Sequence, residues 1–343
     1  MDGGGEKALD AADRSPAAAG RTGWTAIVLA GSRPGEDPLA RRFGLPLKAL
    51  VPALGEPMVG RVVRTLLECS SVARVLILLQ EPQRLATDEL EWLSSDARVA
   101  LAEGANSIAA SLARVAGTPA APWPALITTA DHALLTPEMV EYFLERSSDA
   151  DASLGVVERN VVLARYPGIR RSWVRFGRRA YKGGNLFTLA GEAALPALRL
   201  FADAESDRKN GRKLLWYFGP LLALGAATRT ISLDRAAAHV GRRLGMRLSV
   251  VLLPFPEAAI DVDRPEHLAL AERILGAKPP EDEEPAEAIS IFGQSQASNR
   301  GSSAIALLRG AIAQWEGWRF RFSRAAGLPL LRAGAERLSR KTL

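Results

Sequence analysis

The sequence contains a single cysteine among 343 residues, so no disulfide can form within the chain. Chains without disulfides are typical of reducing compartments. The one thiol, Cys69, lies in an apolar stretch over 62–75, which favours a buried structural cysteine over a reactive one. No apolar run approaches the roughly 20 residues of a membrane-spanning helix, and residues 1–21 lack the apolar core of a signal peptide. We therefore expect a cytoplasmic protein that does not cross the membrane.

Aromatic residues are scarce, at 6% of the chain, while 48% of the residues are hydrophobic and 24% are charged. This composition, with 30 glycines and 21 prolines, excludes collagen-like, disulfide-scaffold and wholly disordered proteins. A chain of this length can bury the core of one large α/β domain or of two smaller ones.

Acidic residues are also few at the C-terminal end. The formal net charge is +6, but residues 300–343 hold nine Lys and Arg against two Asp and Glu, which gives +7. The other 299 residues hold 35 against 36 and carry −1. The basic character belongs to this end of the chain, and the nearly neutral remainder argues against nucleic-acid binding.

A basic amphipathic helix is predicted in the tail, residues 303–343, which follows a Pro-, acid- and Ser-rich linker over 277–302. The apolar residues at helical spacing are Ile305, Leu308, Ile312, Trp315 and Phe322. Such a helix can lie on an anionic membrane surface. Packing against the rest of the chain or against a second subunit fits the same pattern, so the sequence leaves these partners and the oligomeric state open.

From residue 24 onward, short apolar runs alternate with stretches of helical periodicity. The pattern predicts strands over 24–30, 73–79, 125–129, 153–157, 247–253 and 258–262. It predicts helices over 58–68, 107–115, 137–146 and 265–275, and Thr136 is well placed as an N-cap. This order indicates a three-layer α/β/α domain with a mostly parallel sheet over 23–276, after a disordered N-terminus over 1–22.

Two segments interrupt this alternation. Between Glu158 and Glu192 the chain has eight Lys and Arg and no acid, which is typical of a solvated excursion or of one wall of an anion site. Residues 201–243 are helical in composition, and we interpret them as an insertion that returns to the sheet at Arg247.

A glycine-rich loop, from Gly31 to Gly35, directly follows the first predicted strand. The backbone N–H groups of such a loop can approach phosphate oxygens, and Arg33 or Lys48 would supply the counter-charge. Most Gly/Pro loops are plain turns, so this loop alone does not define a phosphate site.

Carboxylates follow two of the predicted strands. Asp131 lies just after 125–129, at the edge of the sheet where ligands bind, and Mg²⁺ prefers one or two carboxylates with phosphate oxygens. Asp261 and Asp263 are predicted to share one face of a strand end. Asp263 also lies just before a predicted helix, so an N-cap role and metal binding are both open for it. The histidines have no metal-site spacing and are interpreted as structural or surface residues, namely His132, His239 and His267.

Taken together, these parts resemble the nucleotidyltransferases of the GT-A-like fold, in particular the MobA-like NTP transferase family. The resemblance covers residues 24–276. It rests on LAG at 29–31, PLKALVP at 46–52 with GEPM at 55–58, Asp131 at a strand end, and DVDRPEHL at 261–268, in that order.

The resemblance implies a Mg²⁺-dependent enzyme that transfers a nucleoside monophosphate from a nucleoside triphosphate to a phosphorylated small molecule. It favours CTP as donor, because enzymes of this group that build head groups commonly use CTP, and it leaves GTP open. The implied catalytic residues are Lys48, Arg33 and Asp131. The implied nucleotide contacts are Leu29, Ala30, Gly31, Ser32, Arg33, Gly35, Lys48, Asn106 and Ser107. The implied metal ligands are Asp131, Asp263 and Asp261, and the implied acceptor-side loop is Lys182, Gly183, Gly184 and Asn185.

The sequence departs from the family pattern in three places. The usual second glycine after Gly31 is absent, the usual Asp-x-Pro after the strand is Asp-His-Ala at 131–133, and the Glu-Asp of the late motif is Glu266-His267. Two other functions stay open: a GT-A glycosyltransferase that uses a nucleotide sugar, and a non-catalytic nucleotide-binding scaffold. If the tail binds lipid, we expect a peripheral position at the inner membrane face.

Overall fold

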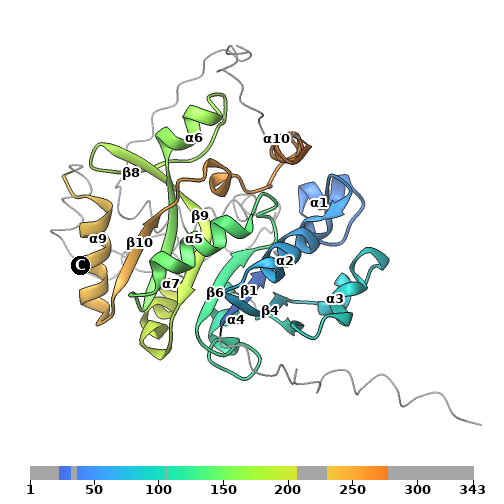
Figure 1. Cartoon of the computed structure of the whole chain (residues 1–343), viewed down its shortest axis with the longest axis horizontal. Coiled ribbons are helices and arrows are strands. Elements are labelled where there is room, and N and C mark those ends of the chain that lie inside the picture. Colours follow the sequence, from blue (N-terminus) through green and yellow to red (C-terminus); the bar gives the residue numbers. More distant parts are fainter. Residues whose placement is uncertain (1–22, 32–36, 106, 207–229, 277–343) are drawn as a thin grey trace, which may run out of the picture.

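The computed structural model describes residues 23–31, 37–105, 107–206 and 230–276 (Figure 1). The segments predicted as a disordered N-terminus, a linker and an amphipathic tail lie outside these residues. None of the helices within the described ranges combines the length and the apolar composition that a membrane crossing needs.

A mixed, mostly parallel sheet forms the middle layer (Figure 1). Its strands, in spatial order, are β10 (Leu248–Leu252), β7 (Ala152–Glu158), β9 (Arg179–Leu189), β6 (Ala125–Thr129), β1 (Trp24–Leu29), β4 (Val72–Leu79) and β5 (Val99–Glu103). Strand β9 runs antiparallel to both of its neighbours in this order and also pairs with β8 (Val174–Phe176), while the other neighbouring pairs are parallel. The predicted sheet type is confirmed, and the parallel strands end at one common edge.

Helices cover both faces of this sheet and give three layers (Figure 1). One face carries α2 (Met58–Glu68) and α5 (Pro137–Ser147), and the other carries α4 (Ile108–Val115), α7 (Leu195–Ser206) and α9 (Leu233–Leu244). Further helices are α1 (Pro38–Arg42), α3 (Trp92–Ser95), α6 (Arg159–Arg165) and α10 (Pro265–Gly276). Short 3₁₀ turns are η1 (Lys48–Leu50), η2 (Pro82–Leu85), η3 (Asp88–Leu90), η4 (Glu192–Ala194) and η5 (Pro256–Ala259), and a small hairpin joins β2 (Pro52–Ala53) to β3 (Glu56–Pro57).

Strand β1 shows how the sequence builds these layers. Ala26 and Val28 belong to the core under α2 and α5, whereas Ile27 belongs to the core under α4 and α7. All three side chains are fully buried. A parallel strand with helices on both faces reads as a continuous apolar run, and this run is the signal that predicted β1.

Most of the predicted elements are present with ends that agree to within one residue. The confirmed strands are β1, β4, β6, β7 and β10, and the confirmed helices are α2, α4, α5 and α10. Thr136 caps α5 as predicted, because its hydroxyl accepts a hydrogen bond of 3.3 Å from the backbone N–H of Met139.

The prediction of a strand over 258–262 is wrong. Pro256 begins η5, and residues 260–264 follow without regular secondary structure. The apolar run is nonetheless buried, with Ile260 and Val262 fully inaccessible to solvent. The apolar run reflects burial and not strand structure, because a short apolar run does not distinguish a strand from another buried segment.

The loop implied for residues 182–185 is also corrected, because all four residues lie within β9. The pairing of β7 with β9 shifts register between Leu154 and Val156, and Asn185 has a φ of 53°. A Cβ atom built on Gly184 would lie only 2.5 Å from a methyl carbon of Leu253. The glycine therefore permits a close approach inside a bulged strand rather than a loop.

The buried thiol predicted for Cys69 is confirmed. Its side chain is 2% exposed, and Sγ donates a hydrogen bond of 3.2 Å to the carbonyl oxygen of Thr65. Burial raises the pKa of Cys69 to about 12, with smaller contributions from the charges of Glu141 and Glu68. A thiol with this pKa carries little thiolate at neutral pH and is a poor nucleophile.

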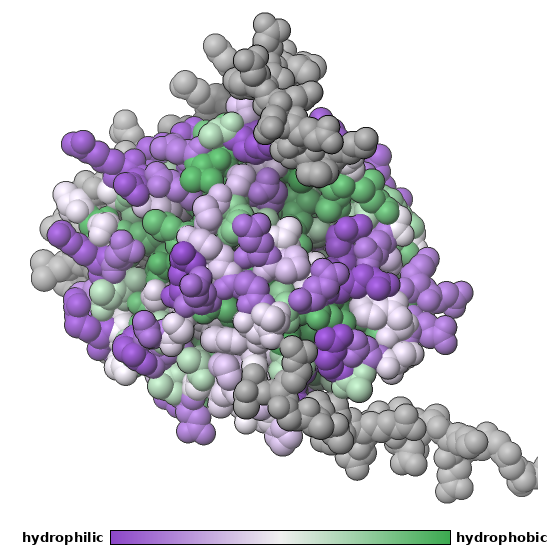
Figure 2. All heavy atoms as spheres, viewed as in Figure 1, coloured by the Kyte–Doolittle hydropathy of each residue, from purple (hydrophilic) through white to green (hydrophobic). Residues whose placement is uncertain are grey.

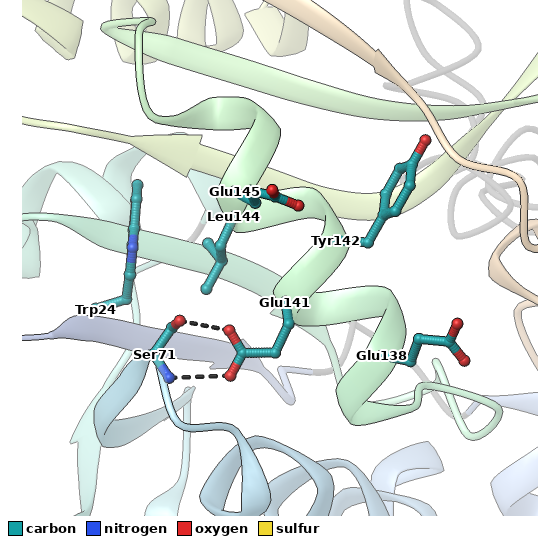
Figure 3. Close-up of a pocket in the computed structure, with 7 residues that line it drawn as sticks. All are labelled: Trp24, Ser71, Glu138, Glu141, Tyr142, Leu144 and Glu145. Carbon is teal, nitrogen blue, oxygen red and sulfur yellow. Dashed lines mark hydrogen bonds between the residues drawn. The ribbon is translucent and has the colours of Figure 1, made fainter.

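Glu141 ties α5 to the turn before β4. Its carboxylate accepts hydrogen bonds from the backbone N–H of Ser71 at 3.0 Å and from Ser71 Oγ (Figure 3). It also accepts one from Ser70 Oγ at 2.9 Å. Ser71, Glu141 and Trp24 line an open pocket at the amino ends of β1 and β4. The pocket lies at the edge of the sheet opposite to the one where α/β proteins bind ligands.

Much of the molecular face seen in Figure 2 is hydrophilic.

Candidate active site

The candidate site begins where two central parallel strands end side by side. Leu29, the last residue of β1, pairs with Thr129, the last residue of β6. The next residue, Ala130, donates its backbone N–H to the carbonyl oxygen of Leu29 at 3.0 Å. Gly31 and Asp131 therefore leave the sheet at the same edge, as the sequence predicts for a ligand crevice.

Lys48 is the centre of this site. Its ammonium group forms an ion pair with Asp131 Oδ2 and lies 2.6 Å from Asp263 Oδ1. The three side chains come from η1, from the end of β6 and from the segment before α10, and their exposed fractions are 5%, 10% and 19%. Thr129 Oγ1 donates a hydrogen bond of 2.5 Å to the second oxygen of Asp131. Residues separated by up to 215 positions thus meet in one buried cluster.

The electrostatics of this cluster depend on its burial. Burial opposes the charged form of Lys48, but the charges of Asp131 and Asp263 outweigh it and raise the pKa of the lysine above its ordinary value. Lys48 therefore carries its positive charge at neutral pH. For Asp263, burial together with the nearby charges of Asp261 and Asp131 raises the pKa, although Lys48 opposes this shift.

Asp261 lies in a second ion cluster beside the first. Its Oδ1 atom is 3.0 Å from Lys182 Nζ and 3.4 Å from Arg171 Nη1. All three side chains are at most 7% exposed. Burial would raise the pKa of Asp261, but the two cations outweigh it and hold the pKa well below its usual range. Burial lowers the pKa of Lys182, and Asp261 works against that shift.

The carboxylates of Asp131 and Asp263 lie on either side of Lys48 Nζ and offer hard oxygen donors to a cation. Within the described ranges, no three His, Cys, Asp or Glu side chains gather as a metal site. Both carboxylates instead contact the same ammonium nitrogen, so the site already holds a positive charge between them. Mg²⁺ is commonly held in this way, by one or two carboxylates completed by phosphate oxygens and water.

His132 follows Asp131 and is fully buried, and neither ring nitrogen has a hydrogen-bond partner. Burial lowers its pKa to about 4, with Asp131 and Asp261 working against that shift and Lys182 adding to it. The ring is therefore neutral at physiological pH and behaves as part of the core.

Ser107, predicted as a nucleotide contact, caps α4, and its hydroxyl accepts a hydrogen bond of 3.2 Å from the backbone N–H of Ala110. The predicted residues Ser32, Arg33, Gly35 and Asn106 lie outside the part of the chain that the structure describes. Among the described candidates, the structure brings together Lys48, Asp131 and Asp263 in one cluster and Asp261 with Lys182 in the neighbouring one.

Thr129 and Arg171 contact the carboxylates of the site, although nothing local in the sequence marks either residue as functional. His267, interpreted from the sequence as a structural or surface residue, lies 3.0 Å from Arg171 through its Nδ1 atom. Thr129 is an ordinary strand residue in sequence, and only its contact with Asp131 marks it. Arg171 belongs to the acid-free basic segment between Glu158 and Glu192, for which the sequence predicts either a solvated excursion or one wall of an anion site. Its side chain is 4% exposed, so this arginine at least is not solvated.

Comparison with known proteins agrees with this architecture. Residues 26–215 match the model of the MobA-like NTP transferase domain. A hypothetical transferase from Thermus thermophilus is 28% identical with a TM-score of 0.59, and the match covers 72% of this chain and 100% of that one. The family match identifies the chain as a nucleotidyltransferase. The chain belongs to the MobA-like NTP transferase family.

Two further solved structures are more distant. The 4-diphosphocytidyl-2C-methyl-D-erythritol synthase from Anaerococcus prevotii is 10% identical with a TM-score of 0.47, covering 74% of this chain and 99% of that one. A CMP:2-keto-3-deoxy-manno-octonic acid synthetase complexed with CTP is 15% identical with a TM-score of 0.45, covering 74% and 98%. No curated protein sequence matches the chain.

Proposed function

We propose that this nucleotidyltransferase transfers a nucleoside monophosphate from a nucleoside triphosphate to a phosphorylated alcohol, sugar or head-group precursor. We favour CTP as the donor and keep GTP as the alternative. The observation that carries the proposal is the buried meeting of Lys48 with Asp131 and Asp263 at the carboxyl edge of the sheet. A buried cation between two carboxylates, at the edge where α/β proteins bind ligands, suits a substrate that carries both phosphate and metal.

Asp131 and Asp263 are the residues that would hold Mg²⁺. One oxygen of each carboxylate already contacts the ammonium of Lys48, and the two side chains are only 10% and 19% exposed. When bound, Mg²⁺ would neutralise charge on the phosphates and orient them for in-line attack. Asp261 is less suited to this role, because Lys182 and Arg171 take up its charge.

In the proposed reaction, a phosphate oxygen of the acceptor forms a bond to the α-phosphorus, and the bond from that phosphorus to the bridging oxygen breaks. Pyrophosphate leaves with the bonding electron pair. The acceptor phosphate is already anionic at neutral pH, so no strong general base is needed. The protein mainly positions and stabilises charge, and Lys48 would turn from the carboxylates toward the triphosphate.

The remaining predicted contacts belong to the same proposal. The backbone from Leu29 to Gly31 would approach the triphosphate, together with Ser32, Arg33 and Gly35. Asn106 and Ser107 would contact base and ribose. The segment 182–185 would face the acceptor from β9.

A transfer assay tests this function directly. With α-labelled CTP, GTP, ATP or UTP and a panel of phosphorylated alcohols and sugars, we expect one donor to pass its label to an acceptor and to release pyrophosphate. The reaction should stop when EDTA removes the divalent metal and should return when Mg²⁺ is added in excess. Turnover of a nucleotide sugar, with none of the triphosphates consumed, would contradict the proposal and favour a glycosyltransferase.

A further inference from the structure

Asp263 needs support from outside its own segment. Residues 260–264 have no regular secondary structure, so no helix or strand ladder fixes the direction of this carboxylate. One tie comes from the sheet side, where the backbone N–H of Val262 donates to the carbonyl oxygen of Asp131 at 3.1 Å. This bond holds the segment beside the end of β6, but it leaves the two flanking residues to be fixed by other contacts.

Further contacts to the backbone of this segment come from one arginine and one histidine. Arg171 Nη2 donates to the backbone carbonyl of Asp261 at 3.0 Å, and Arg171 Nη1 lies 3.0 Å from His267 Nδ1. The backbone N–H of Asp263 donates to the same Nδ1 atom at 3.3 Å. Arg171 and His267 thus contact the backbone immediately before Asp263 and at Asp263 itself.

These contacts define the state of the imidazole ring. Arginine and a backbone N–H can only donate, so Nδ1 is the acceptor, and the two donors share its single lone pair. The ring proton of a neutral His267 then resides on Nε2.

The position of His267 explains why an acceptor is useful there. It is the third residue of α10, and a side chain at this position commonly reaches back to accept a backbone N–H before the helix, as in a capping box. In this chain the imidazole of His267 is that acceptor, and Arg171 supplies a buried donor to it.

We propose that Arg171 and His267 are positioning residues that hold the backbone of 261–263 so that the Asp263 carboxylate faces Lys48 and the metal. This inference rests on the proposed function for what Asp263 binds, but the contacts themselves do not depend on it. Residues that orient a metal ligand typically change metal affinity 10–100-fold when removed.

Matched substitutions of His267 separate positioning from simple packing. His267→Asn places an amide oxygen near the position of Nδ1, whereas His267→Gln moves the acceptor one bond further out. We expect the Asn variant to bind Mn²⁺ together with CTP within about threefold of wild type, and the Gln and Arg171→Ala variants to bind about tenfold or more weakly. The measurement is isothermal titration calorimetry on the full chain, with melting temperatures recorded in parallel. Equal Mn²⁺ affinity in all folded variants would overturn the proposal.

A second measurement separates this inference from the proposed function. Histidine ¹⁵N NMR of the protein without nucleotide should show His267 protonated on Nε2 only, with the Nδ1 signal shifted in Arg171→Ala. A ring protonated on Nδ1 would overturn the positioning contacts whatever the enzyme transfers. If wild type binds none of the four triphosphates with Mn²⁺ while the NMR result holds, the proposed function fails and the contacts stand.

Discussion

Replacing Lys48 with methionine is expected to lower kcat of nucleotidyl transfer by about 10²–10³-fold, the effect of removing one preorganised hydrogen-bond donor that stabilises a transition state. Methionine keeps the buried, unbranched stem but removes the ammonium that contacts Asp131 and Asp263. Charge develops on the triphosphate as pyrophosphate leaves, so the loss should appear mainly in kcat. Steady-state kinetics at saturating donor and acceptor measure it.

Arg114→Met is the matched control, because it removes an exposed cation from α4. We expect this variant to keep the wild-type rate. Circular dichroism should show that Lys48→Met is folded. A folded Lys48→Met variant whose kcat stays within threefold of wild type would contradict the role assigned to this lysine.

Replacing Asp261 with asparagine is expected to lower the free energy of unfolding by about 3–5 kcal/mol, the cost of breaking a buried ion pair by removing one partner. The variant keeps the shape of the side chain but leaves Lys182 and Arg171 buried without their shared counter-charge. Chemical denaturation at neutral pH measures the loss.

Two further variants make this result specific. Adding Lys182→Met to Asp261→Asn removes one of the unpaired cations and should recover part of the stability. Glu145→Gln breaks an exposed pair with Arg146, whose side chains are 77% and 46% exposed, and should cost no more than about 1 kcal/mol. A loss below about 1 kcal/mol in Asp261→Asn would show that the second cluster is not a tightly coupled buried group.

The sequence predicts the frame of the fold well because its signals are local. Strands β1 and β6 are buried on both faces, so their sequences are apolar runs. Thr136 predicts the start of α5, because its hydroxyl caps the first turn of the helix. Asp131 is also recognisable, because it directly follows a buried strand at the edge where ligands bind. Lys48 is suggested only by its motif, since an isolated lysine is usually solvated.

The parts that the sequence does not predict are those set by long-range contacts. Nothing local tells that β9 inserts antiparallel between β6 and β7, because its residues 182–185 contain two glycines and resemble a loop. The pairing of Arg171 with His267 spans 96 positions and links a basic segment to a helix start. Such side chains meet only in the folded chain, so residue type and spacing in the sequence do not predict their contact.

The central claim is that Lys48, Asp131 and Asp263 form a metal-dependent site for a nucleoside triphosphate. The most direct measurement is a thermal-shift panel of CTP, GTP, ATP and UTP, each with and without Mg²⁺, on wild type and on Asp131→Ala. A ligand at 100 times its Kd adds about 2.7 kcal/mol to the stability of the folded state. We predict that one triphosphate with Mg²⁺ raises the wild-type melting temperature and that Asp131→Ala abolishes this shift. An equal shift in the folded Asp131→Ala variant, or none with any triphosphate in wild type, would contradict the claim.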